Sequence, residues 1–148
     1  MKKNMLRLAG LVGLAIVTMV AVVRPSKASI GVVNKADLAG PWQMTTIGQT
    51  GCGFGTTLYT FTLNSAGVAS NVFATSHTAG CGDATSTGAT FQINSVSSNG
   101  SGTANLGCGP SCGWNLNLQV APDRSSFSLI DVSPANPGNF IEGTAIHQ

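Results

Sequence analysis

The chain has 148 residues, enough for one domain, with four cysteines and a formal net charge of +2. Five of its seven basic residues precede position 29, so the remainder has two basic and five acidic side chains, a net charge of −3. Two cations cannot form the basic patch that binding to nucleic-acid phosphates requires, so this composition excludes nucleic acid as a partner.

The N-terminus, residues 1–28, has the pattern of a secretory signal peptide. Basic residues precede an uncharged run over 8–23, and Ser26 and Ala28 place small residues before an expected cleavage site. The alternative is a retained membrane anchor, but this run of 16 residues is shorter than the ~20 that a spanning helix needs. We expect a secreted or periplasmic protein, without membrane attachment after removal of the signal, in which the cysteines form disulfides.

The rest of the chain is expected to be a short lead-in over 29–39 and one disulfide-linked domain over 40–148. No run has helical periodicity with caps, whereas several alternate apolar with polar residues, as half-buried strands do. The clearest is 114–120, WNLNLQV, in which every second residue is apolar. Eight strands are expected, in chain order at 42–47, 57–63, 68–78, 85–96, 103–107, 114–120, 127–132 and 140–146.

The connections between these strands predict the topology. In an up-and-down meander every second connection lies at the same end, which groups the three cysteine-containing loops at 48–55, 79–84 and 107–113 with the loop at 134–138. We therefore expect an all-β fold, an antiparallel eight-stranded up-and-down barrel without exposed strand edges. The alternative is a two-sheet β-sandwich, which usually needs a long crossover that this chain lacks.

The four cysteines all lie in glycine-flanked loops, and four cysteines allow three pairings. Cys108 and Cys112 flank a three-residue turn and are expected to face each other, which pairs Cys52 with Cys81. A zinc site that combines His77 with Cys81, Cys108 and Cys112 is an alternative, as is a redox dithiol at Cys108 and Cys112. Disulfides suit an exported chain better than either.

The large apolar residues on the strands are expected to point into the barrel. Eight strands enclose a space that side chains fill or that one small ligand occupies. We expect no catalytic site, because the two histidines accompany no nucleophile motif, and no metal or cofactor. The candidate barrel-lining residues are Trp42, Tyr59, Phe61, Phe91, Trp114 and Leu116.

The segment Gly40-Pro41-Trp42, at the start of the first strand of an eight-strand meander, resembles the calycins, the group of lipocalins, fatty-acid-binding proteins and avidins. The segment 100–104, which precedes a tryptophan-containing strand, is also similar to avidins. The resemblance implies a barrel fold and does not identify a ligand. The chain departs from lipocalins in having no basic residue in its last strand, 140–146, to pack against that tryptophan. It departs from avidins in having only Trp42 and Trp114.

Two functions from different classes follow. The first is an exported, non-enzymatic barrel with a structural or interaction role in the envelope or extracellular space, including assembly with copies of itself through its charge-poor surface. The second is a calycin-like carrier that binds a small apolar molecule inside the barrel.

Overall fold

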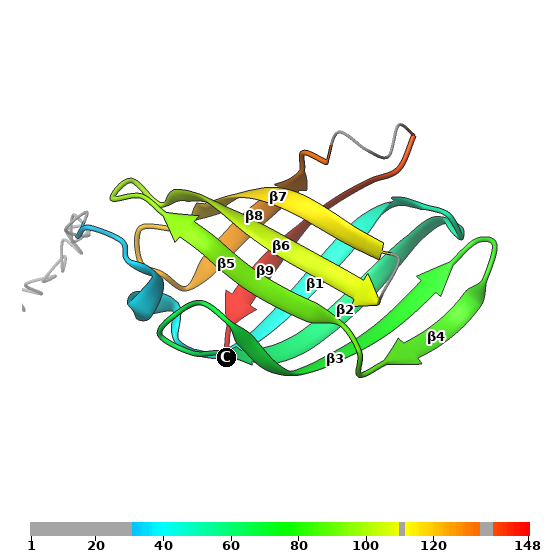
Figure 1. The fold of residues 1–148 in the computed structure, drawn as a ribbon, viewed down its shortest axis with the longest axis horizontal. Coiled ribbons are helices and arrows are strands. Elements are labelled where there is room, and N and C mark those ends of the chain that lie inside the picture. Colours follow the sequence, from blue (N-terminus) through cyan, green and yellow to red (C-terminus); the bar gives the residue numbers. More distant parts are fainter. Residues whose placement is uncertain (1–30, 110–111, 134–137) are drawn as a thin grey trace, which may run out of the picture.

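The computed structural model describes residues 31–109, 112–133 and 138–148, so the expected signal peptide lies outside the described residues. These ranges are all-β apart from one 3-10 helix, η1, at Lys35–Leu38 (Figure 1). The strands are β1 (Gly40–Thr50), β2 (Gly53–Leu63), β3 (Ala69–Thr78), β4 (Gly82–Ser86), β5 (Thr90–Val96), β6 (Ser101–Gly109), β7 (Cys112–Val120), β8 (Ser126–Asp131) and β9 (Phe140–His147).

All of these strands belong to one curled antiparallel sheet, in the order β4-β3-β2-β1-β9-β8-β7-β6-β5. Each strand pairs with the next along the chain except at β4 and β5, and the first strand pairs with the last from Trp42↔His147 to Gln49↔Phe140. The alternative of a two-sheet sandwich is therefore wrong.

The expected strand at 85–96 is wrong as a single element, which makes nine strands instead of eight. Its first part is β4, whose pairing with β3 ends at Ala74↔Ser86, and its second part is β5, which pairs with β6. Both run in the same direction, and residues 87–89 carry the chain from one neighbour to the other. Gly88 lies in this break, and glycine commonly marks a bend in a strand.

The curl brings β5 close to the start of β3 without a continuous ladder between them. Val68 forms an isolated bridge with Gln92, and the backbone N–H of Ile93 donates to the carbonyl oxygen of Gly67 at 2.8 Å. In the described ranges the hydrogen-bonded sheet therefore curls without closing, which corrects the expectation of a closed barrel.

The expected loop at 48–55 is also too long. Pairing of β1 with β2 continues to Thr50↔Gly53, so the connection is a two-residue turn at Gly51 and Cys52. Gly48 and Gly55 suggested a loop but lie opposite each other in the ladder.

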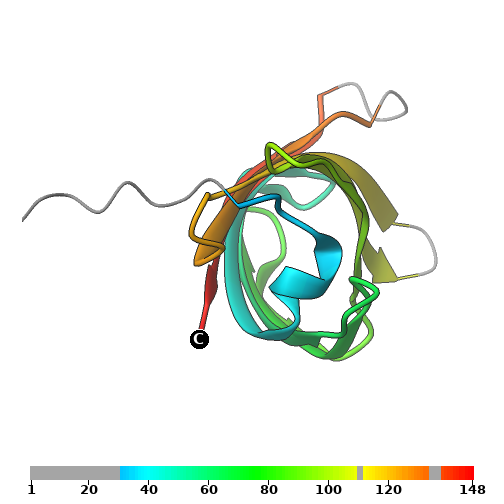
Figure 2. The ribbon, with the colours of Figure 1, turned by 90° about the vertical axis from the view of Figure 1, so that its left-hand side faces the viewer.

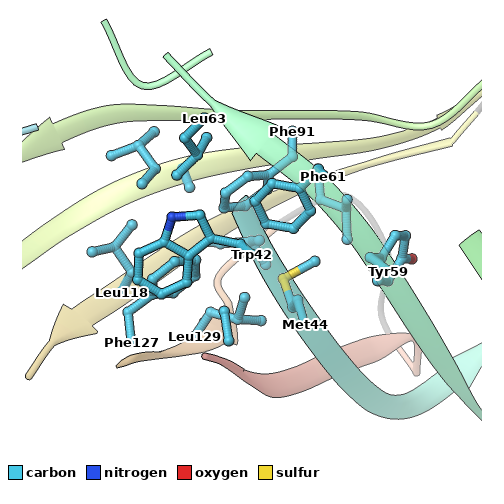
Figure 3. Close-up of a cluster of buried hydrophobic side chains, with 14 of the residues drawn as sticks. Trp42, Met44, Tyr59, Phe61, Leu63, Phe91, Leu118, Phe127 and Leu129 are labelled. Carbon is cyan, nitrogen blue, oxygen red and sulfur yellow. The ribbon is translucent and has the colours of Figure 1, made fainter. Parts of the chain in front are cut away.

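One half of the curl is filled with large apolar side chains, as Figure 3 shows. Trp42, Phe91 and Phe127 are each 1% exposed. The rings of Trp42 and Phe127 lie 4.8 Å apart, and those of Phe91 and Phe127 are stacked at 5.9 Å. Such close packing leaves no room for a ligand in this half of the sheet.

Helix η1 lies across the end of the curl beside this filled half (Figure 2). Its Leu38 is fully buried, and the Leu38 carbonyl oxygen accepts a 2.8 Å hydrogen bond from Trp42 Nε1. Lys35 Nζ donates to the Asn94 carbonyl oxygen at 3.1 Å, and Arg124 Nε donates to Asp37 Oδ2 at 3.1 Å. The expected lead-in thus includes core residues and covers one end of the fold.

Candidate functional site

The candidate site lies at the end where the cysteine-containing turns meet. Cys52, in the β1–β2 turn, and Cys81, in the β3–β4 turn, form a disulfide with a Cα–Cα distance of 5.3 Å. The prediction of this pair is therefore confirmed. Cys108, near the end of β6, is also disulfide-bonded, and the expected Cys108–Cys112 pair involves a side chain outside the described residues.

Glycines let the two turns approach each other closely. The backbone N–H of Gly80 donates to the Cys52 carbonyl oxygen at 2.7 Å, and a Cβ at position 80 would meet that oxygen at 2.7 Å. Gly82, with φ of +71°, begins β4 in a conformation that other residues rarely adopt. The disulfide and this contact together fasten the β1–β2 hairpin to the β3–β4 hairpin.

A pocket of about 320 Å³ lies inside the curl at this end, with the disulfide and Cys108 among its lining residues. The pocket opens to solvent, because Gly51, Cys81 and Ala84 in its lining are exposed. The β1–β2 turn, the β3–β4 turn and Cys108 near the end of β6 therefore meet at one opening, and strand counting predicted that the cysteines share one end. The volume is at the small end of the range for ligand sites in proteins.

The two walls of the pocket differ in chemistry. The wall formed by β1, β2 and β3 has hydroxyl side chains at inward positions: Thr46, Thr50, Thr57, Tyr59, Ser76 and Thr78. On the opposite side, Trp114 of β7 and Ile141 of β9, which are 7% and 5% exposed, line the pocket with apolar side chains. None of the described lining residues carries a charge.

Tyr59 lies at the boundary between the filled half and the pocket. Figure 3 shows its ring at the edge of the apolar cluster, with the hydroxyl directed away from it. Burial raises the pKa of Tyr59 above its ordinary value of 10.0, and hydrogen bonds with the side chains of Thr57 and Thr46 partly offset this. The phenol is thus neutral at physiological pH and belongs to a hydroxyl cluster with two threonines.

The six candidate lining residues divide between the filled half and the pocket. Trp42, Phe61, Phe91 and Leu116 are buried in the core, where Phe61 and Phe91 pack with ring centroids 5.1 Å apart. Tyr59 and Trp114 line the pocket. Their alternation in the strands places all six inside the curl but does not distinguish packed positions from open ones.

Sequence reasoning missed the inward hydroxyls, above all Thr46, which is 3% exposed. A signal was available, since Thr46 continues the inward series of Trp42 and Met44, and Thr57 precedes Tyr59 by two residues. Polar residues at inward positions of a strand indicate a hydrogen-bonded site or a cavity.

The alternative zinc set is not brought together. Cys81 is joined to Cys52, and His77 faces outward, where its Nδ1 lies 2.7 Å from Asp83 Oδ1 in an exposed pair. Within residues 31–109, 112–133 and 138–148 no three His, Cys, Asp or Glu side chains are placed to hold a metal ion. The described residues also contain no helix long and apolar enough to cross a membrane.

No protein-family model matches this chain, and no curated protein matches it. The function must therefore be argued from the pocket.

Proposed function

We propose that this protein is an exported, non-enzymatic binding protein that carries one small molecule in the pocket at its cysteine end. The observation that carries this proposal is the contrast between the two halves of the curl. Trp42 and its neighbours fill one half and η1 covers that end, while the other half encloses about 320 Å³ and opens to solvent. A protein that needed only a stable core would have filled this space with side chains.

The proposal includes a calycin-like barrel. The Val68–Gln92 bridge and the Ile93–Gly67 hydrogen bond bring β5 beside the start of β3, so the curl has a barrel-like shape although its ladder is not continuous there. β9 extends to His147, whose ring lies 4.9 Å from that of Trp42. This imidazole is not the arginine that lipocalins typically pack against that tryptophan, so this departure from the resemblance remains.

Export agrees with the covalent structure. The Cys52–Cys81 disulfide is compatible with an oxidising compartment, and disulfides are rare in the cytosol. The proposed location is the periplasm or the extracellular space.

The test is native mass spectrometry of the protein purified from its own source. We expect one noncovalent adduct, and we expect Ser76→Phe, which places a ring in the pocket, to abolish it. Thr75→Phe is the matched control, because Thr75 is the adjacent residue of β3 and faces outward. An adduct that survives Ser76→Phe would refute the proposed location, and protein that is always without ligand would refute the carrier role.

An assembly role has one supporting observation. On the outer face, Gln49 of β1 pairs with Phe54 on one side and Phe140 on the other, and these rings are 52% and 48% exposed. Exposed aromatic residues on adjacent strands suit contact with a second copy of the chain. Sedimentation of the wild type and of Phe54→Ser/Phe140→Ser tests this role, which requires an oligomer that the double substitution dissociates.

A further inference from the structure

The pocket also specifies what kind of molecule fits it. We propose that the ligand is a small, uncharged aromatic compound with at least one hydroxyl or carbonyl group, held between the hydroxyl wall and Trp114. This inference rests on the proposed function and narrows it, because a wholly apolar ligand would leave the hydroxyls of Ser76 and Thr78 without a hydrogen-bond partner in the described part of the chain.

Size sets the first limit. A volume of about 320 Å³ corresponds to about ten water molecules at ~30 Å³ each. Below it, Met44 is fully buried and Phe61 and Phe91 pack together, so a chain cannot extend into the filled half. A compound of one or two rings fits, and a long acyl chain does not.

Charge sets the second limit. Lys35 and Arg124, the basic residues of the described chain, both lie at the η1 end, where Lys35 contacts Asn94 and Arg124 contacts Asp37. An anion in the pocket would lose its hydration without gaining a cationic partner, and a cation would find no carboxylate among the described lining residues. The pocket therefore favours a neutral ligand.

Hydrogen-bonding capacity sets the third limit. Tyr59, Thr57 and Thr46 interact with one another, but among the described residues the hydroxyls of Ser76 and Thr78 form no hydrogen bond with the protein. Both side chains are half-buried on the hydroxyl wall. An oxygen on the ligand satisfies hydroxyls that otherwise depend on water.

Trp114 supplies the apolar side. It is 7% exposed, lines the pocket with Ile141, and presents the largest apolar ring among the lining residues. Aromatic side chains gain from offset or edge-to-face contact with another ring in addition to the area that is buried. A ring substituted with oxygen on one edge thus matches both walls at once.

The experiment is equilibrium dialysis of the mature protein at neutral pH against three probes of nearly equal size: naphthalene, 2-naphthol and 2-naphthoate. We expect 2-naphthol to bind about tenfold more tightly than naphthalene, as one satisfied hydrogen bond predicts, and 2-naphthoate to bind most weakly. Thr78→Val should reduce the preference for 2-naphthol, because it removes, at nearly constant shape, a hydroxyl that has no partner among the described residues. Thr75→Val, at an outward-facing position of the same strand, is the control and should not change it.

The outcomes separate the two proposals. If naphthalene binds as tightly as 2-naphthol, or 2-naphthoate binds most tightly, the ligand class is wrong, while loss of that binding in Ser76→Phe would still support the pocket. If no probe binds up to its solubility limit, the small-molecule site itself is refuted and the ligand class with it. A preference for 2-naphthol that is equal in Thr78→Val and Thr75→Val would contradict the assigned role of the hydroxyl wall.

Discussion

Trp42 Nε1 donates a buried 2.8 Å hydrogen bond to the carbonyl oxygen of Leu38. This contact joins η1, at Lys35–Leu38, to β1 and closes one end of the curl, while the opposite end stays open. One end of the molecule is therefore closed and packed, whereas the other end holds the pocket. Substitutions in the packed end should lower the free energy of unfolding more than substitutions that border the pocket.

Trp42→Phe should lower the free energy of unfolding by about 2 kcal/mol or more, because it leaves the buried Leu38 carbonyl without its donor and removes contact with Phe127. Denaturant unfolding followed by far-ultraviolet circular dichroism measures this loss. Trp114→Phe is the control, with an expected loss of about 1 kcal/mol, because its ring borders an open pocket instead of a filled core. Equal losses would contradict the division into a filled and an open half.

Replacing both Cys52 and Cys81 by alanine should destabilise the protein by about 3.5 kcal/mol, the chain-entropy value for a loop with a sequence separation of 29 residues. Thermal and denaturant unfolding of the double variant measure the loss. The wild type treated with a reductant that opens its disulfides should be at least as destabilised as the double variant, because it loses this crosslink together with the disulfide of Cys108. A loss below about 1 kcal/mol would show that the Gly80–Cys52 backbone contact alone fastens the two hairpins.

The carboxyl group of Asp37 should titrate below its ordinary range. The backbone N–H of Asn34, which donates to Asp37 Oδ2 at 3.0 Å, is the main cause of the lowered pKa, and Arg124 adds to it. Because the pKa of Asp37 is lower in the folded state, its carboxylate stabilises the attachment of η1 at pH values above the unfolded pKa. This stabilisation is lost as pH falls through the folded pKa. Carbon NMR of the carboxyl group during an acid titration measures it.

Arg124→Ala should raise the pKa of Asp37 only part of the way to its ordinary value, since the bond from Asn34 remains. Lys35→Ala is the control and should leave it unchanged, because Lys35 Nζ contacts the Asn94 carbonyl oxygen instead. A full return to the ordinary value in Arg124→Ala would assign the effect to the ion pair.

Tyr59 is the one tyrosine of the chain, so the ultraviolet absorbance of tyrosinate reports this residue alone. Burial should raise its pKa above 10.0, and Thr46→Val should raise it further by removing a hydrogen bond that lowers it. The folded state favours the neutral phenol, so the raised pKa of Tyr59 contributes to the free energy of unfolding. This contribution is fully present below the unfolded pKa and is lost as pH rises through the higher folded pKa. Thr45→Val should titrate like the wild type, and a shift in that variant would show that the effect is indirect.

The sequence by itself determined the features that local patterns control. Alternation at 114–120 predicts which side chains of β7 point inward, since successive residues of a strand face opposite sides wherever the strand lies. The order of connections predicts that the cysteines lie at one end of the fold. Because Cys108 and Cys112 flank a short turn and are expected to pair with each other, Cys52 is expected to pair with Cys81, as the structure shows.

Only the tertiary structure decided what depends on several strands at once. The break at 87–89 arises where the chain leaves β3 to reach β6, a constraint that no local pattern records. Trp42 and Trp114 alternate alike in their strands, yet one is packed in the core and the other borders a pocket. Whether an inward side chain meets another side chain or open space depends on the summed volumes of residues from distant strands and from η1, and that sum is set only when the sheet curls.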